Sequence, residues 1–379
     1  MVCLDQYLIR QQSVWGGERQ TGKAGLCRCF AGIVENSVGC FGRESPMSTR
    51  EDVARMAGVS GATVSYVLNN TKRVTPQVRE RVLEAANTLG YRPNLVARSL
   101  VMKQTMHVAL LVDNLMNPYY GQLAEGVQSV ASRYGYLVSS LAVNVSNRAS
   151  LLELTSRGVD GILFAVGSHD DMKECVGDHL SVPCLWGSEA PSYRNAIFHM
   201  VHCLKEKGHE KIAFLSGMPV EKTNHYRYRF FVEALKQEGL PVCQALVVDG
   251  RQNGNTDEQA GIEATKELLR RKEVFTAIFA VNDLMALGCY RQLRLEGYQV
   301  PRDVSLVGCD GIPFLENMYP ALATLDMKGF EVGQHMMYSL LEKIQPKWEG
   351  LARKDQIEGE FLERESVAEA PRYGSFRSQ

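Results

Sequence analysis

The sequence has no long apolar run. Although 45% of its 379 residues are hydrophobic, no uninterrupted stretch approaches the roughly 18 residues that a membrane-spanning helix needs. The first 30 residues also lack the basic start, the short apolar stretch and the small-residue cleavage site of a secretory signal. We therefore expect a cytoplasmic protein with no membrane partner.

Sequence motifs of catalysis are missing as well. There is no Gly-x-Ser-x-Gly elbow and no Gly-x-Gly-x-x-Gly fingerprint. The segment from Gly17 to Ala24 approaches a phosphate-binding loop, but Ala24 stands where a hydroxyl would have to hold magnesium, so we interpret it as a chance match. We predict that the chain is not an enzyme and needs no cofactor.

Metal and disulfide patterns are weak. The ten cysteines show no framework spacing and are expected to be reduced thiols. Cys27 and Cys29, with Cys40, lack the spacing of a zinc ribbon and have no second pair. His199 and His202 would share a helix face, but no third ligand can be assigned, so we predict no metal site.

The charge is divided unevenly along the chain. Residues 48–103 hold nine basic and four acidic side chains, a balance of +5, and residues 1–47 have a balance of +1. Because the whole chain carries −1, residues 104–379 are left with −7. A small basic module attached to a large acidic body suits a protein that touches phosphates with one end.

Residues 1–46 show no sustained hydrophobic period. They are rich in glycine, cysteine and arginine, and we expect them to be unstructured. Met47 directly precedes the first clear helix signal. We therefore hypothesise that translation starts at Met47.

Three short helices are predicted over residues 48–92. Capping boxes at Ser48–Glu51 and Thr49–Asp52 start the first, which Gly58 ends. Ser60 can cap a second helix that closes at Asn69-Asn70, and Thr75-Pro76 starts a third that stops at Gly90. The first two lie about three residues apart, as in a helix-turn-helix, and form either a DNA-reading hairpin or a compact helix pair.

Beyond Met106, apolar strands alternate with amphipathic helices. Strand-like runs begin at residues 108, 161, 211, 245, 276 and 304. Continuous apolar strands separated by helices predict parallel sheets covered on both faces, and about nine candidate strands suit two similar lobes. Ligands in such folds lie beyond the carboxyl ends of the strands, here at residues 113–120, 167–171, 282–283 and 310.

These motifs together resemble one known family. "DVARMAGVSGATVSYVLN", "GYRPNLVARSL", "NPYY", "GHEKIAFLSG", "VNDLMALG" and "VSLVGCDG" are similar to the LacI (lactose repressor) family of bacterial transcription regulators, from about Thr49 to Ser366. The resemblance implies a helix-turn-helix domain (48–92), a hinge (93–105) and a two-lobed, periplasmic-binding-protein-like α/β body (106–366). Lobe one would be 106–190 plus 327–346, lobe two 191–326 plus 355–366, and 367–379 a tail.

For DNA, the family likeness implies that the second helix lies in the major groove of an operator. Base-reading positions would be Gly61, Ala62 and Tyr66, where family members commonly have Arg in place of Tyr66. Phosphate contacts would come from Thr63, Ser65 and Asn69, with Thr49 and Ser60 at the helix starts. In the hinge, Leu100 would wedge the minor groove, flanked by Asn94, Val96, Ala97 and Arg98, and paired hinges imply a homodimer.

For the body, the family likeness implies a small-molecule effector, a sugar or sugar phosphate, held between the lobes. The matching positions are Tyr119, Tyr120, Arg227, Asn282 and Asp310. Each also has a structural alternative, since Asn282 could cap a helix, Asp310 could be a turn residue and the tyrosines could be packing. The chain also looks shorter than the family norm before Gly158 and between Phe198 and Gly208. We expect a repressor of carbohydrate-related genes, or alternatively a sensor or regulator whose effector response is lost or replaced by a protein partner.

Overall fold

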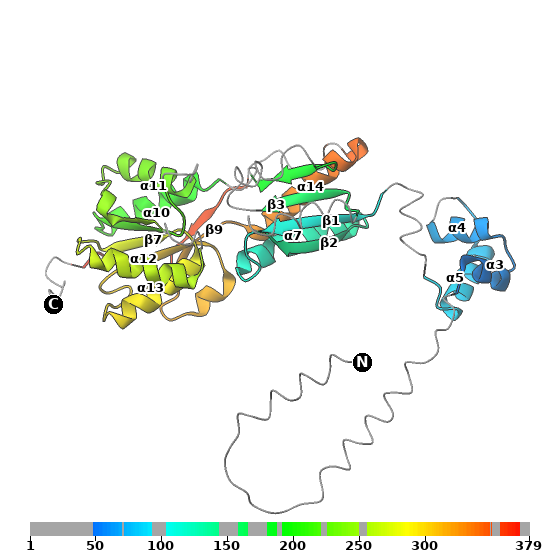
Figure 1. Cartoon of the computed structure of the whole chain (residues 1–379), viewed down its shortest axis with the longest axis horizontal. Helices are drawn as coiled ribbons and strands as arrows, with labels where there is room; N and C mark the ends of the chain where they lie inside the picture. The colour runs from blue at the N-terminus through cyan, green and yellow to red at the C-terminus, as the bar shows by residue number, and fades with distance from the viewer. Residues whose placement is uncertain are drawn as a thin grey trace, which may run out of the picture. The chain divides into compact units, whose positions relative to one another are not determined.

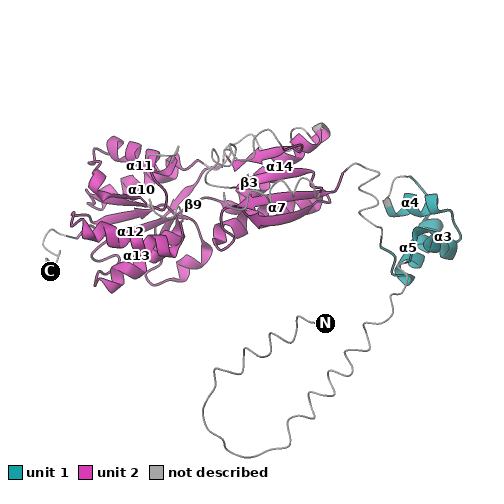
Figure 2. Cartoon of the chain, in the orientation of Figure 1, with its two compact units in different colours: residues 1–94 teal, residues 95–379 magenta. Residues whose placement is uncertain are grey.

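A computed structural model describes residues 48–69, 72–92, 104–143, 158–165, 180–187, 192–220, 226–249, 256–348, 350 and 357–371. The chain divides into two compact units, residues 1–94 and 95–379 (Figure 2). The expected extension 1–46 and the hinge residues 94–100 lie outside the described ranges. The two units are therefore treated separately.

The first unit holds three helices, α3 (Arg50–Ala57), α4 (Gly61–Asn69) and α5 (Pro76–Thr88). Thr49 and Asp52 form the reciprocal capping box at the start of α3, and Gly58 ends that helix with a φ of 65°. The capping box predicted between Ser48 and Glu51 is wrong. Ser48 Oγ instead donates a 2.6 Å bond to the carbonyl of Leu89, since its hydroxyl reaches the end of α5.

Small aliphatic side chains make the core of this unit. The three helices pack against one another around buried residues of each, including Val53, Val64, Val67 and Val82. Because these residues recur at helical spacing, one apolar stripe per helix closes a single small core. The predicted helix-turn-helix fold is confirmed.

The body begins with a parallel sheet. Strands β1 (His107–Val112), β2 (Leu137–Ala142), β3 (Gly161–Ala165) and β4 (Cys184–Trp186) lie in the order β2-β1-β3-β4. Helix α7 (Pro118–Arg133) packs on β2, and α14 (Gly329–Ile344) packs on β3 and β4. Helix α14 returns to this sheet from far along the chain.

A second sheet has the order β10-β9-β8-β7-β5-β6. Its strands are β5 (Ile212–Ser216), β6 (Val247–Asp249), β7 (Ala277–Ala280), β8 (Ser305–Asp310), β9 (Ala323–Asp326) and β10 (Glu360–Leu362). All neighbours are parallel except β10, which runs antiparallel to β9 and departs from the predicted parallel pattern. Glu360 of β10 lies opposite Asp326 of β9, and Leu362 lies opposite Thr324.

Four longer helices cover the second sheet. They are α10 (Arg194–Glu206), α11 (Tyr226–Gln237), α12 (Glu258–Arg270) and α13 (Asp283–Leu295), with short 3-10 turns η5 (Gln244–Leu246) and η6 (Pro313–Asn317). A third turn, η7 (Pro346–Trp348), follows α14 and contacts it. Figure 1 shows α10 and α11 on one side of the sheet and α12 and α13 on the other. The body is a two-lobed α/β fold, as predicted.

Two of the chain segments that link the sheets touch each other. The amide of Ser192 donates to Ile357 O at 2.9 Å, and the amide of Gly359 donates to Ser192 O at 3.1 Å. This short bridge lies just before α10 and just before β10. The bridge fixes the backbone beside Tyr193, whose side chain contacts Arg227.

Candidate DNA-binding and effector sites

Helix α4 has one buried face and one accessible face. Val64 and Val67 are buried, whereas Ala62 is exposed and Tyr66, one turn later, is partly exposed. Residues four apart on a helix share a face, so the expected base-reading pair Ala62 and Tyr66 lies side by side. Gly61 begins the helix, where a side chain would approach Arg50 Nε at 3.3 Å.

The start of α4 is held by its own hydroxyls. The amide of Thr63 donates to Ser60 Oγ at 3.2 Å, and the two hydroxyls lie 2.9 Å apart. Thr49 is likewise engaged with Asp52, through both its amide and its hydroxyl. The structure thus gives Ser60 and Thr49 capping roles, and their contacts with DNA remain predictions.

Tyr66 has a cationic neighbour that the sequence did not suggest. Lys72 Nζ lies 4.7 Å from the centre of the Tyr66 ring, within the range of a cation–π interaction. Ser65 is partly exposed next to Tyr66.

Asn69 is the last residue of α4. The predicted hinge contacts fall outside the described residues; they are Asn94, Val96, Ala97, Arg98 and Leu100.

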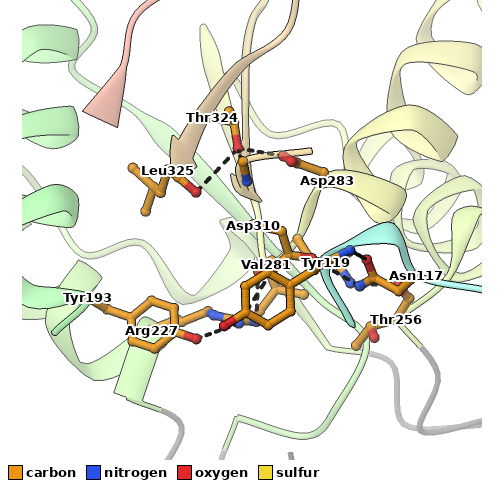
Figure 3. Close-up of polar contacts among 12 residues, drawn as sticks. Asn117, Tyr119, Tyr193, Arg227, Thr256, Val281, Asp283, Asp310, Thr324 and Leu325 are labelled. Atoms are coloured by element: carbon orange, nitrogen blue, oxygen red, sulfur yellow. Dashed lines mark hydrogen bonds and ion pairs between the residues drawn. The ribbon is translucent and has the colours of Figure 1, made fainter. Parts of the chain in front are cut away.

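In the body, Arg227 is the centre of a polar group that we call the Arg227 cluster, with Asn117, Tyr193, Val281 and Asp310 (Figure 3). Arg227 Nη1 donates to Val281 O at 3.0 Å, and Nη2 donates to Tyr193 Oη at 2.9 Å. Nη2 also lies 3.7 Å from Asp310 Oδ1. Asn117 Nδ2 donates to Asp310 Oδ2 at 3.0 Å, linking the loop after β1 to the end of β8.

Asp310 is held in an unusual backbone conformation. Its φ is 134°, a region that non-glycine residues rarely adopt and that persists only where surrounding contacts impose it. Burial raises the pKa of Asp310 to about 6, while Arg227 and Asn117 lower it. Burial therefore makes the Asp310 carboxyl group harder to ionise than a carboxyl group in water.

A second buried acid lies on the same edge of the sheet. Asp283 Oδ2 accepts the amide of Ile312 at 2.8 Å, and Oδ1 accepts the Thr324 hydroxyl at 2.6 Å. Burial, with the charge of Asp310, raises the pKa of Asp283 to about 7, and these hydrogen bonds lower it. Asp283 ties α13 to β9 and to the turn after β8.

Of the other predicted effector residues, Tyr119 and Tyr120 lie near the Arg227 cluster, whereas Asn282 caps a helix. Tyr119 is buried, and Figure 3 shows its ring beside Arg227 and Tyr193. Tyr120 meets Tyr119 edge to face at 5.6 Å and donates to Asp113 Oδ2 at 3.0 Å. Asn282 instead caps α13 by accepting the amide of Met285 at 2.9 Å, and donates to Thr256 O at 2.8 Å. Its contacts therefore support the role of a helix cap for Asn282, rather than that of an effector ligand.

Asn117 and Tyr193 were missed by the sequence reading. Asn117 opens the quoted "NPYY" motif and caps α7 by accepting the amide of Tyr119, so the motif itself was the available signal. Tyr193 carried no comparable pattern. The apparent shortening after Phe198 leaves α10 continuous from Arg194 to Glu206.

The histidine pair has ordinary partners. His202 Nδ1 lies 3.1 Å from Glu238 Oε1, and the ring of His199 meets Phe361 edge to face. Within the described ranges, no three metal-binding side chains come together. No helix among the described residues is long and apolar enough to cross a membrane.

A helix-turn-helix unit joined to a two-lobed α/β body defines the class of ligand-responsive DNA-binding regulators. Residues 49–94 match the family of bacterial regulatory proteins named lacI, and residues 201–367 match a periplasmic binding protein-like domain. The chain is 35% identical over 310 residues to catabolite control protein A of Priestia megaterium, covering 78% of this chain and 92% of that protein. It is 31% identical to the HTH-type transcriptional repressor PurR of Vibrio atlanticus, covering 85% and 99%. The chain belongs to the LacI family of transcription regulators, which are not enzymes.

Solved structures agree on the fold. The lac repressor dimer bound to operator and the anti-inducer ONPF superposes with a TM-score of 0.72 at 24% identity, covering 85% of this chain and 99% of that one. The regulator CelR in complex with cellobiose gives a TM-score of 0.59 at 28% identity, covering 84% and 99%. The match to residues 49–94 favours the DNA-reading hairpin over a compact helix pair.

Proposed function

We propose that this regulator is a homodimeric repressor of carbohydrate-related genes that reads a palindromic operator with α4. The observation that carries the DNA-reading part is the accessible face of α4, where Ala62 and Tyr66 lie one turn apart. Two-fold operators mirror the symmetry of a protein dimer. Because it acts on DNA, we place it in the bacterial cytoplasm, at the nucleoid when bound.

Tyr66 and its neighbours would give an unusual operator. Arginine is the common bidentate reader of guanine, and here the position holds Tyr66 with Lys72 above its ring. Ala62 offers only a methyl group. Readout would therefore rely on methyl contacts and DNA shape as well as hydrogen bonds, with Gly61 allowing close approach and Thr63, Ser65 and Asn69 binding phosphates.

The effector is proposed to be a sugar or sugar phosphate bound at the Arg227 cluster. Tyr119 and Tyr120 provide aromatic surface, and Arg227 and Asp310 provide polar groups. Sugars present apolar faces and hydroxyls that suit such a combination. The effector can change operator affinity only by binding the two states of the body with different affinities.

Two substitutions test the DNA-binding proposal. Thr63→Ala removes a predicted phosphate contact, and Leu100→Ala removes the predicted wedge, so each should weaken operator binding about tenfold. Thr88→Ala is a matched control, because the Thr88 hydroxyl donates to Glu84 O within the same helix, α5. Operator affinities that are unchanged in both variants, measured by fluorescence anisotropy, would contradict the proposal.

The effector proposal has its own measurement. Thermal unfolding of the full chain with a panel of sugars and sugar phosphates should reveal a ligand that raises the melting temperature. Arg227→Met should abolish that rise. A panel in which no compound stabilises the wild-type chain would favour the alternative, a regulator whose effector response is lost or replaced by a protein partner.

A further inference from the structure

Tyr193 lies against the guanidinium group of Arg227. The guanidinium Nη2 donates to the phenol oxygen at 2.9 Å, and Cζ lies 4.7 Å from the ring centre. The opposite nitrogen, Nη1, is held by Val281 O. The protein thus supplies acceptors to both terminal nitrogens of Arg227.

The phenol is presented by a backbone that is fixed on both sides. Ser192 exchanges two main-chain bonds with residues 357 and 359, and α10 starts at Arg194. Helix α10 packs against α11, which carries Arg227. Little conformational freedom is left to be lost when Tyr193 meets Arg227, and such preorganisation strengthens a contact.

We infer that Tyr193 is an internal ligand of the Arg227 cluster, and that the Tyr193 hydroxyl takes the place on the guanidinium that an effector hydroxyl would take. The inference rests on the proposed effector role of Arg227 and Asp310. It follows that any effector competes with a tethered phenol, whose effective concentration beside Arg227 is on the order of millimolar or higher. The side chains of the cluster are linked to one another in series, Asn117 to Asp310, Asp310 to Arg227 and Arg227 to Tyr193.

Chemical rescue tests this inference. Tyr193→Ala in the full chain should leave a space beside Arg227 that p-cresol, which is the tyrosine side chain as a free molecule, can fill. We expect p-cresol to raise the melting temperature of Tyr193→Ala saturably by about 4 °C, as a hydrogen bond to a charged group would. Toluene, which lacks the hydroxyl, should give less than half of that rise, and wild type should respond to neither compound.

Two results would overturn it. Equal shifts with toluene and p-cresol would mean that Tyr193 only fills space, and an equal p-cresol shift in wild type would mean that the compound binds elsewhere.

A milder variant keeps the test decisive if Tyr193→Ala does not fold. Tyr193→Phe removes only the hydroxyl and should lower the melting temperature by about 4 °C. Tyr228→Phe is the matched control, because the Tyr228 hydroxyl makes a 3.4 Å bond to Gln244 at the surface and its loss should have little effect. Equal melting temperatures for the two variants would refute the inference.

These measurements are independent of DNA. Failure to find an operator would defeat the proposed function without changing the p-cresol shift. Failure of the p-cresol shift would remove Tyr193 as an internal ligand and leave operator binding untouched. A sugar that stabilises Tyr193→Phe more than wild type would support both the effector site and the competition.

Discussion

The DNA-binding unit and the Arg227 cluster are assembled over very different distances along the chain. In the first unit, the polar bonds that start α3 and α4 join residues three apart, Thr49 to Asp52 and Ser60 to Thr63. In the body, Asn117 and Asp310 are 193 residues apart, and Arg227 and Val281 are 54 apart. The first site depends on local helix signals, whereas the second exists only when both sheets have formed.

The largest loss of stability among these substitutions is expected at Arg227, in the site that is assembled from distant segments. Arg227→Met leaves Asp310, whose side chain is 4% exposed, without its cationic neighbour and should lower the free energy of unfolding of the body by about 3 kcal/mol. Denaturant unfolding measures the change. Arg229→Met, two residues on and 54% exposed, is the control, and a loss no greater than the control's would show that the cluster does not stabilise the body.

The next effect is a pH dependence confined to the body. The pKa of Asp283 is raised from 3.8 to about 7, so the folded chain keeps this proton to higher pH than the unfolded chain does. The contribution of Asp283 to stability should therefore be fully present below about pH 4, be lost by about 1 kcal/mol per pH unit as the pH rises to about 7, and be absent above.

Asp283→Asn tests the assignment. The variant should show a flatter stability profile between about pH 4 and pH 7, because the titrating group is gone. A profile as steep as that of wild type would place the titration elsewhere.

A smaller effect should appear in the DNA-binding unit. Thr49→Ala removes a capping box and should cost about 1 kcal/mol in the unfolding of residues 48–92. Thr75→Ala is a matched control, because within the described ranges the Thr75 side chain makes no capping bond. If the two variants are equally stable by denaturant unfolding, local capping does not hold this unit.

The smallest effect concerns the Tyr66–Lys72 pair. A double-mutant cycle with Tyr66→Ala and Lys72→Ala on operator affinity should give a coupling energy of about 0.5 kcal/mol, as for a partly exposed cation–π pair. Additive losses would mean that the two side chains contact DNA separately.

The contrast in contact distance also explains what the sequence could predict. The helices of the first unit followed from caps at Thr49 and Ser60 and from Pro76 at the start of α5, all of which act within a few residues. Strands β1, β3 and β7 followed from continuous apolar runs. Strand β2 was not singled out, because two serines interrupt its apolar residues and its first residue, Leu137, is 62% exposed.

The effector end was only partly predictable. Arg227 and Asp310 were chosen by family likeness, but their geometry depends on partners far along the chain. Nothing local marks Tyr193 as a partner of Arg227, since their contact depends on the bridge between Ser192 and residues 357–359. The family likeness makes Asn282 an effector contact, whereas the structure shows it as a helix cap. The sequence could not separate these roles, because both use the same side-chain amide.

The most direct test of the central claim is selection of bound sequences from a random duplex pool with the full chain, followed by affinity measurements against salt. We predict a palindromic consensus bound at least about 10³-fold more tightly than bulk DNA, with the half-site bases set by Tyr66 and its neighbours. Weak binding that only follows salt concentration, with no consensus, would contradict the proposal that this chain is an operator-specific regulator.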